Sequence, residues 1–323
     1  MVLDDDLYTV TADNSDGTKT ACMFGMPVKY KDVDGTTKFI DTSIQETSIL
    51  KKVTDGYDYI NGANEFEVEF SKNPAKGIKV STENYSLIMS IMNPYSETTA
   101  IKKNKANDTE KRVFTEDSFV YENAFGADTS VKYTNTNVGL KEDIILDKNV
   151  GLNKFDFEID TKGDIPILSS DGATITIADK SDPNIVKYSF GKLFADDSFE
   201  KTNIDLASQE LDSSISTSSD CSSEKTDIDL DSQAHYSSIS ASSDCSSIQP
   251  DSDEFLQTNI ANTSAETQKS TQDADFDHHT ENVYYELSSL GDSKYKVTVV
   301  VSSDYLNNSD IVYPVTIDPS VTL

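Results

Sequence analysis

The sequence predicts an all-β protein built from antiparallel sheets, with the layered architecture of a β-sandwich. Three observations support this. Short segments alternate between apolar and polar residues, Asp-Gly and Asn-Gly pairs separate them, and no long stretch has helical period. Hydrophobic residues make up 36% of the 323 positions, which is enough to fill a core. We expect either one super-sandwich or two packed sandwiches.

The alternating segments define the predicted strands. In FEVEF at 66–70 the apolar side chains share one face, while Glu67 and Glu69 lie on the face expected to meet water. Segments 154–159 and 173–179 alternate in the same way. Because successive side chains of a strand point to opposite faces, this pattern indicates one buried and one solvated face.

Turn signals separate these strands. Asp-Gly and Asn-Gly pairs supply the positive φ that tight hairpins need, and we expect hairpin turns at residues 16–17, 34–35, 55–56, 61–62 and 171–172. The run YSLIMSIMNP at 85–94 is apolar in both phases, which predicts a central strand buried on both faces. The charged segment 96–112 is expected to form a long loop or a domain seam.

Strand patterns return near the C-terminus, at 283–288, 294–301 and 312–318. Pro314 has no N–H to donate, so the last of these predicts an edge strand or a bulge. Residues 303–310 are expected to make one short helical turn.

A low-complexity segment divides the two β portions. At 199–282 Ser, Thr, Asp, Asn and Gln dominate, and two similar copies begin at Thr202 and Thr226, 24 residues apart. This composition buries too little apolar area to offset the entropy of ordering, and two copies are too few for a solenoid. We therefore expect one sandwich made of 1–198, with its possible seam, and 283–323, interrupted by a long disordered Ser/Asp-rich insertion.

Net charge limits the classes of partner. At −30 the chain repels phosphate backbones, so no nucleic-acid partner is expected. The basic cluster of Lys102, Lys103, Lys105, Lys111 and Arg112 is interpreted as a solvated loop. No stretch approaches about 18 consecutive apolar residues, so no membrane insertion is expected either.

The residue types of common active sites are poorly placed. His235, His278 and His279 all fall in the low-complexity segment, where no rigid scaffold would hold them. The sequence has no GxSxG, P-loop or Rossmann glycine pattern. We therefore expect no enzyme and no cofactor, and keep a hydrolase with an unrecognised carboxylate pair as a third hypothesis.

Metal binding and disulfide bonding are not expected. Residues 32–41 contain DVDG but lack the ligands of a calcium loop, and a hairpin turn explains them better. In DIDLD at 227–231 we expect loose attraction of counter-ions. Cys22, Cys221 and Cys245 are odd in number and wrongly spaced for zinc, and a bond between the last two stays open.

Sugar binding is the alternative function. A carbohydrate module needs exposed flat aromatic rings with polar neighbours. Tyr57 and Tyr59 are the candidate ligand-binding residues, and Tyr284 and Tyr285 a further pair. The absence of Trp weakens this alternative, since a tyrosine at a strand edge also serves as half-buried core.

Three segments resemble a known family. TADNSDGTKTACMFGMPVKYKDVDGTTKFIDTSI at 11–44, FVYENAFGADTSVKYTNTNVGLKEDIIL at 119–146 and YKVTVVVSSDYLNNSDIVYPVTIDPSV at 295–321 occur in this order. They are similar to the non-repeat β region of Gram-positive surface proteins, namely wall-associated RHS/YD-repeat proteins and proteins with DNRLRE domains. The sequence departs from that pattern at Phe39, near where the family has a tryptophan, and in the insertion.

The resemblance implies a non-catalytic structural or adhesive module that precedes DNRLRE or RHS-type repeats. It implies an extracellular, cell-wall-associated protein whose partners are downstream domains of the same polypeptide and, in addition, cell-wall or host glycans. MVLDDDLYTV at the N-terminus has neither the basic nor the apolar region of a secretion signal. We therefore expect this chain to be an internal region of a longer secreted protein. The resemblance carries over no active-site residues.

Overall fold

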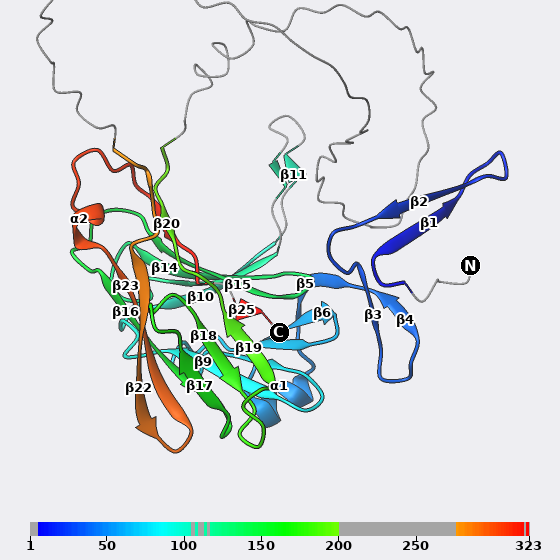
Figure 1. Cartoon of the computed structure of the whole chain (residues 1–323), viewed down its shortest axis with the longest axis horizontal. Helices are drawn as coiled ribbons and strands as arrows, with labels where there is room; N and C mark the ends of the chain where they lie inside the picture. Colours follow the sequence, from blue (N-terminus) through cyan, green and yellow to red (C-terminus); the bar gives the residue numbers. More distant parts are fainter. Residues whose placement is uncertain are drawn as a thin grey trace, which may run out of the picture. The chain divides into compact units, whose positions relative to one another are not determined.

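The computed structural model describes residues 6–104, 107–108, 113–114, 117–199, 276–319 and 321–322. These residues belong to one compact unit, made of Met1–Glu200 and Asp275–Leu323 (Figure 1). They form large antiparallel sheets, and the predicted all-β sandwich is confirmed. Within the described ranges, the helices are too short to cross a membrane.

The first sheet has the strand order β22-β23-β16-β9-β8-β7-β6-β5. Its strands are β5 Asp41–Glu46, β6 Tyr59–Ala63, β7 Glu67–Phe70, β8 Ile78–Ser81, β9 Ser86–Ile91, β16 Lys154–Asp160, β22 Val283–Gly291 and β23 Lys294–Val301. The predicted central strand is β9, which lies between β16 and β8 and buries Leu87, Met89 and Ile91. The predicted strands at 154–159, 283–288 and 294–301 are present as well.

The second sheet has the main order β10-β13-β14-β15-β25-β19-β18-β17, with β24 beside β15 and β20 beside β24 and β21. Its strands are β10 Thr99–Lys103, β13 Ser118–Glu122, β14 Thr129–Asn135, β15 Gly139–Leu146, β17 Ile165–Leu168, β18 Ile175–Ala178, β19 Val186–Phe190, β20 Ala195–Asp196, β21 His279–Thr280, β24 Val315–Ile317 and β25 Val321–Thr322. Small two-stranded sheets pair β1 Thr9–Asp13 with β2 Lys19–Met23, β3 Lys29–Lys31 with β4 Thr37–Phe39, and β11 Asn107–Asp108 with β12 Val113–Phe114.

The inner faces of both sheets contribute to one apolar core. Phe119, Tyr121 and Tyr133 come from neighbouring strands of the second sheet, with ring centroids 5.3 Å and 6.1 Å apart in edge-on contact. Phe155 and Phe157 of β16 contribute from the first sheet. Burying large aromatic side chains between two sheets gives the main apolar stabilisation of such a sandwich.

The C-terminal portion completes both sheets. β22 and β23 extend the first sheet beside β16, while β24 and β25 pair with β15 in the second. The chain also crosses from the first sheet to the second after β9. Residues 99–103 of the expected loop at 96–112 form strand β10, because Thr99–Lys103 pair with β13.

Several turn signals were read correctly. Hairpins connect β1 to β2, β3 to β4 and β17 to β18, and Gly17, Gly35 and Gly172 have positive φ there. The expectation at 61–62 was wrong, because both residues lie inside β6. The expectation at 55–56 was also wrong, because Gly56 caps a helix, α1, at a φ of 72°.

The other local corrections concern helix and edge signals. Helix α1, Ile49–Asp55, was not predicted, whereas the short turn near 303 is α2, Ser303–Leu306. Pro314 precedes β24 and so removes no ladder hydrogen bond. Strand β24 is therefore not an edge strand, since it pairs with β15 on one side and β20 on the other.

Candidate functional site

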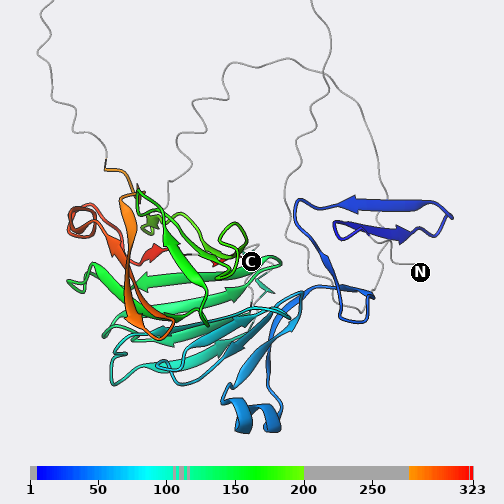
Figure 2. The ribbon, with the colours of Figure 1, turned by 60° about the horizontal axis from the view of Figure 1, so that its bottom comes forward.

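Helix α1 presents apolar side chains to solvent. It lies on the connection between β5 and β6 (Figure 2). Ile49, Leu50 and Val53 are 84%, 74% and 78% exposed, and the helix buries none of its residues. Single exposed apolar residues are ordinary, but three on one short helix mark a candidate contact surface. We call Ile49, Leu50 and Val53, together with Lys72 and Lys76, the α1 tip.

The helix is fixed at both ends. Ser48 Oγ accepts a hydrogen bond from the Lys51 amide at 3.2 Å, and the Gly56 amide donates to the Lys52 carbonyl. A side-chain N-cap and a left-handed glycine C-cap satisfy backbone groups that a short helix otherwise leaves unpaired. The sequence signal for this helix is the Ser48 and Gly56 pair, in a stretch too short to show helical periodicity.

An ion-pair network ties α1 to the first sheet. Glu69 of β7 is fully buried, with Lys51 Nζ at 3.0 Å and Lys79 Nζ at 2.7 Å. Lys51 Nζ also lies 2.5 Å from Glu67. Burial lowers the pKa of Lys51, but the two carboxylates outweigh it and the net pKa is raised. The expectation that Glu69 faces water was wrong, because its side chain is fully buried and pairs with Lys51 of α1 and Lys79 of β8.

The two predicted ligand-binding tyrosines lie beneath this tip. Tyr57 is 5% exposed, and burial raises its pKa to about 12. Lys76 Nζ lies 4.3 Å from the centre of the Tyr57 ring. Tyr59 is partly buried and packs against Phe119 with centroids 5.6 Å apart. The structure thus brings the tyrosines to one end of the sheet, but Tyr57 is not the exposed platform that the sequence suggested.

Two lysines of the tip interact with rings. Lys72 Nζ lies 5.5 Å from the Tyr59 ring, in addition to the contact of Lys76 with Tyr57. Contacts of this kind are weak at exposed sites, and Lys76 Nζ also donates a hydrogen bond to the Asp55 carbonyl. The tip therefore combines apolar side chains with cations in a chain whose net charge is −30.

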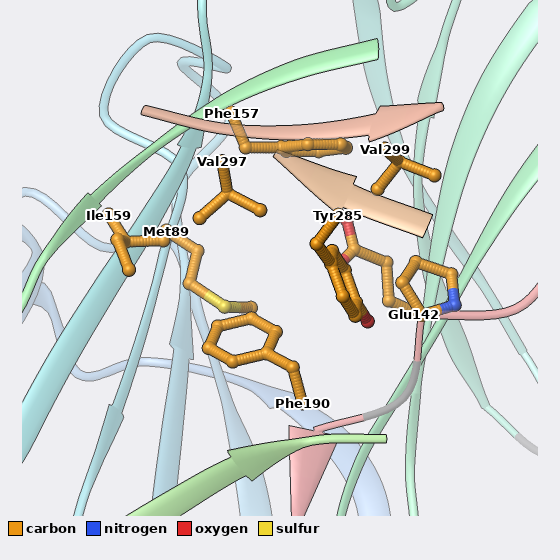
Figure 3. A pocket seen from close by; sticks show the side chains of 9 residues that line it. Met89, Glu142, Phe157, Ile159, Phe190, Tyr285, Val297 and Val299 are labelled. Carbon is orange, nitrogen blue, oxygen red and sulfur yellow. The ribbon is translucent and has the colours of Figure 1, made fainter. Parts of the chain in front are cut away.

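A second polar feature lies inside the sandwich. Glu142 of β15 is 4% exposed and lines a small internal cavity with Met89, Phe190 and Tyr285 (Figure 3). The Tyr133 hydroxyl lies 3.1 Å from Glu142 Oε1. Burial raises the pKa of Glu142 to about 8, while the Tyr133 hydroxyl opposes the shift. In GLKEDIIL at 139–146, Glu142 alternates on the same face as Leu140 and Ile144. This position is the sequence signal that could have identified Glu142 as a buried carboxylate.

Two histidines are better ordered than the sequence suggested. His278 Nδ1 lies 2.7 Å from Asp197 Oδ2, and His279 Nδ1 lies 2.7 Å from Asp196 Oδ1. The expectation that no rigid scaffold holds these histidines was wrong, because β21 pairs with β20. His278 and His279 therefore belong to the sandwich, although the sequence placed them in the insertion at 199–282.

A buried ion-pair cluster lies at the β18–β19 end. Lys187 Nζ is 2.8 Å from both carboxylate oxygens of Asp164 and 2.7 Å from Asp179. The Tyr85 ring centre lies 4.2 Å from the same ammonium. Hydrogen bonds from Lys187 and Ser181 hold the Asp179 pKa well below its usual range. We interpret this cluster as structural, because each charge has a partner.

The remaining candidate residues divide between the described and undescribed parts. Residues 32–36 form the turn of the β3–β4 hairpin, and no cluster of three potential metal-ligating residues occurs in the ranges that the structure covers. Lys102 and Lys103 lie on strand β10 and not in the expected loop, with their ammonium groups 3.7 Å from Asp117 and 3.6 Å from Glu122. The other basic residues of that cluster, His235, Cys221, Cys245 and segment 227–231 lie outside the described residues, and Cys22 is a free, exposed thiol. Tyr285 is buried, whereas Tyr284 is 39% exposed.

Comparisons with protein-family models, curated proteins and solved structures found no match. The resemblance to the Gram-positive surface proteins therefore stays a prediction.

Proposed function

We propose that this chain is a non-catalytic structural and adhesive module of a secreted bacterial cell-surface protein, with the α1 tip as its contact surface. The observation that carries the proposal is the exposure of Ile49, Leu50 and Val53 on helix α1. The helix is held in place by its two caps and by the ion pair of Lys51 with the buried Glu69. A rigid support lets exposed side chains bind without a large cost of ordering. The resemblance in the sequence supports the extracellular, wall-associated part of the proposal.

Charge favours an anionic partner, and we assign the tip to anionic polymer of the Gram-positive cell wall. The chain as a whole repels such a polymer at its net charge of −30. At the tip, Lys72 and Lys76 lie over tyrosine rings, and Lys76 Nζ also donates to the Asp55 carbonyl. We therefore propose that the lysines of the tip make the contact with an acidic surface.

The test is sedimentation of the purified chain with purified Gram-positive cell walls. We expect the wild type to bind, and the combined change of Ile49, Leu50 and Val53 to serine to weaken binding about tenfold or more. The matched control changes Ile165 and Ile167 to serine, because these side chains are also exposed, at 40% and 44%, but lie on β17. Equal loss in both variants, or no binding by the wild type, would sink the adhesive assignment.

The carbohydrate-binding alternative predicts a different result in the same assay. Binding would then be saturable, would be displaced by soluble glycan and would depend on Tyr59, the more accessible of the two tyrosines. The burial of Tyr57 and the lysine over its ring do not favour stacking of a sugar there.

A further inference from the structure

The N-terminal arm of the chain contributes no side chain to the apolar core. This arm, residues 6–40, holds the two-stranded sheets β1–β2 and β3–β4 (Figure 1), and the core is built by other parts of the chain. Every residue of β2 is exposed. Because an isolated two-stranded sheet is only marginally stable in water, the β1–β2 hairpin stands to gain from a further strand.

The free edge of this hairpin is β2. The Phe24 amide donates to the Tyr8 carbonyl at 2.9 Å, and the Asn14 amide donates to the Thr18 carbonyl at 2.8 Å. Backbone groups alternate in direction along an antiparallel pair, so the N–H and C=O groups at the odd-numbered positions of β2 point away from β1. These positions are Lys19, Ala21 and Met23.

The opposite edge of the hairpin is partly occupied. The Leu7 carbonyl, just before β1, accepts hydrogen bonds from the Val28 amide at 2.9 Å and the Lys29 amide at 3.2 Å. The chain that leads from β2 to β3 therefore covers the beginning of the β1 edge. Among the residues that the structure describes, β2 pairs with no strand except β1.

The end strands of the first large sheet, by contrast, are protected against a further strand. Strand β22 has a bulge at 289–291, and its Tyr285 amide already donates to the Gly172 carbonyl at 2.8 Å. Strand β5 has an irregular register before Ile44, whose amide donates to Asp117 Oδ2 at 3.0 Å. Neither strand presents an unbroken row of free backbone groups.

The end strands in the main order of the second large sheet are protected as well. Strand β17 contains Pro166, which has no N–H to offer, and β10 carries Lys102 and Lys103. Proline, lysine and bulges are features by which edge strands avoid pairing with another chain. Strand β2 has a regular register and no proline, and its central residues 20–22 are uncharged.

Charge does not prevent two arms from meeting. Residues 6–40 contain five aspartates and four lysines, although the net charge of the whole chain is −30. Lys19 Nζ lies 2.9 Å from Asp13 Oδ1 within the hairpin. Two copies of β2 in antiparallel alignment would place Ala21 opposite Ala21 and Lys19 opposite Met23. This register joins the outward backbone groups of both copies, and no like charges face each other.

We propose that β2 is a strand-addition site whose partner is the β2 strand of a second copy of this chain. The two hairpins form one four-stranded antiparallel sheet across a two-fold axis at Ala21. Each hairpin thereby gains the further strands that a stable sheet needs. Because both copies use the same surface, the contact closes at a dimer.

Sedimentation velocity of the full chain tests the proposal. We expect a reversible monomer–dimer equilibrium for the wild type between about 1 µM and about 200 µM. Ala21→Pro removes the outward N–H at the axis, and proline is tolerated where the N–H of an edge strand faces solvent. This variant should weaken dimerisation about tenfold or more.

Thr11→Pro is the matched control. Thr11 lies opposite Ala21 in the hairpin, and its N–H also points outward, but from the β1 edge. This variant detects general damage to the hairpin and should leave the dimer intact. A wild type that stays monomeric throughout the concentration range, a dimer that survives Ala21→Pro, or an equal loss in both proline variants would overturn the proposal.

A cysteine on the axis tests the register. The background carries Cys22→Ser, Cys221→Ser and Cys245→Ser, which removes the three native thiols. In it, Ala21→Cys should form an intermolecular disulfide under mild oxidation, because the paired Cα atoms lie about 5.5 Å apart in the proposed sheet. Thr11→Cys at the same protein concentration should stay unlinked, and the reverse pattern would contradict the β2 interface.

Discussion

Glu142→Gln removes a proton-binding group from the sandwich interior without changing its size. Burial raises the pKa of Glu142 to about 8 in the folded chain, against 4.5 for a solvent-exposed glutamate. The folded state therefore binds more protons across this window, so this group makes stability fall as pH rises. At about 1.4 kcal/mol per pH unit, the loss between pH 5 and pH 8 is between about 3 and 4 kcal/mol.

The glutamine variant should lack this loss. Its amide still places an oxygen near the Tyr133 hydroxyl but stays neutral, at the cost of an amide N–H that needs a partner. We therefore expect Glu142→Gln to be less stable than or equal to the wild type at pH 5 and more stable at pH 8. The difference between the two proteins should change by about 3 kcal/mol over that range.

Urea unfolding followed by tyrosine fluorescence and far-ultraviolet circular dichroism measures this difference, since the chain has 15 Tyr and no Trp. Stability should be compared at constant ionic strength from pH 5 to pH 8. Glu286→Gln is the control, because its carboxylate is 45% exposed and its removal should shift the stability curve little. Parallel pH dependence of wild type and Glu142→Gln would refute the reasoning.

Two further changes test the packing. Gly77→Ala should lower the free energy of unfolding by more than about 3 kcal/mol, because the new Cβ would meet the Met89 carbonyl at 1.9 Å and the φ of residue 77 is 71°. Gly151→Ala is the control, because Gly151 has the same φ but open space around it. In the same thermal unfolding assay this control should cost only about 1 kcal/mol. Glu69→Gln should destabilise the chain by about 2 kcal/mol, because it leaves two lysines facing a neutral group, and no change in the unfolding midpoint would contradict the buried network.

Much of the strand pattern could be predicted because one face of each strand is buried. In FEVEF the apolar residues are in the core as expected, and in β16 the same alternation identified Phe155 and Phe157. Alternation reports only which side a residue occupies. It could not show that Glu69 is buried, because the lysines that pair with its carboxylate come from α1 and from the neighbouring strand β8.

The candidate site was also hard to predict, because contacts from other parts of the chain decide which of its side chains are exposed and ordered. Tyr57 and Tyr59 were expected to be exposed rings, but Tyr57 is buried and the lysine that lies over it comes from the β7–β8 turn. His278 and His279 were assigned to the insertion because the sequence around them is polar. Their order comes from Asp196 and Asp197, about 80 residues earlier in the chain.

The clearest test of the proposed function is protease treatment of intact cells of the source bacterium, with mass spectrometry of the released peptides. If the chain is a wall-exposed module, peptides from it should be released while the cells stay sealed, and should appear among those of other surface proteins. If its peptides are found only after the cells are broken, in the cytosolic fraction, the proposal of a surface module is contradicted.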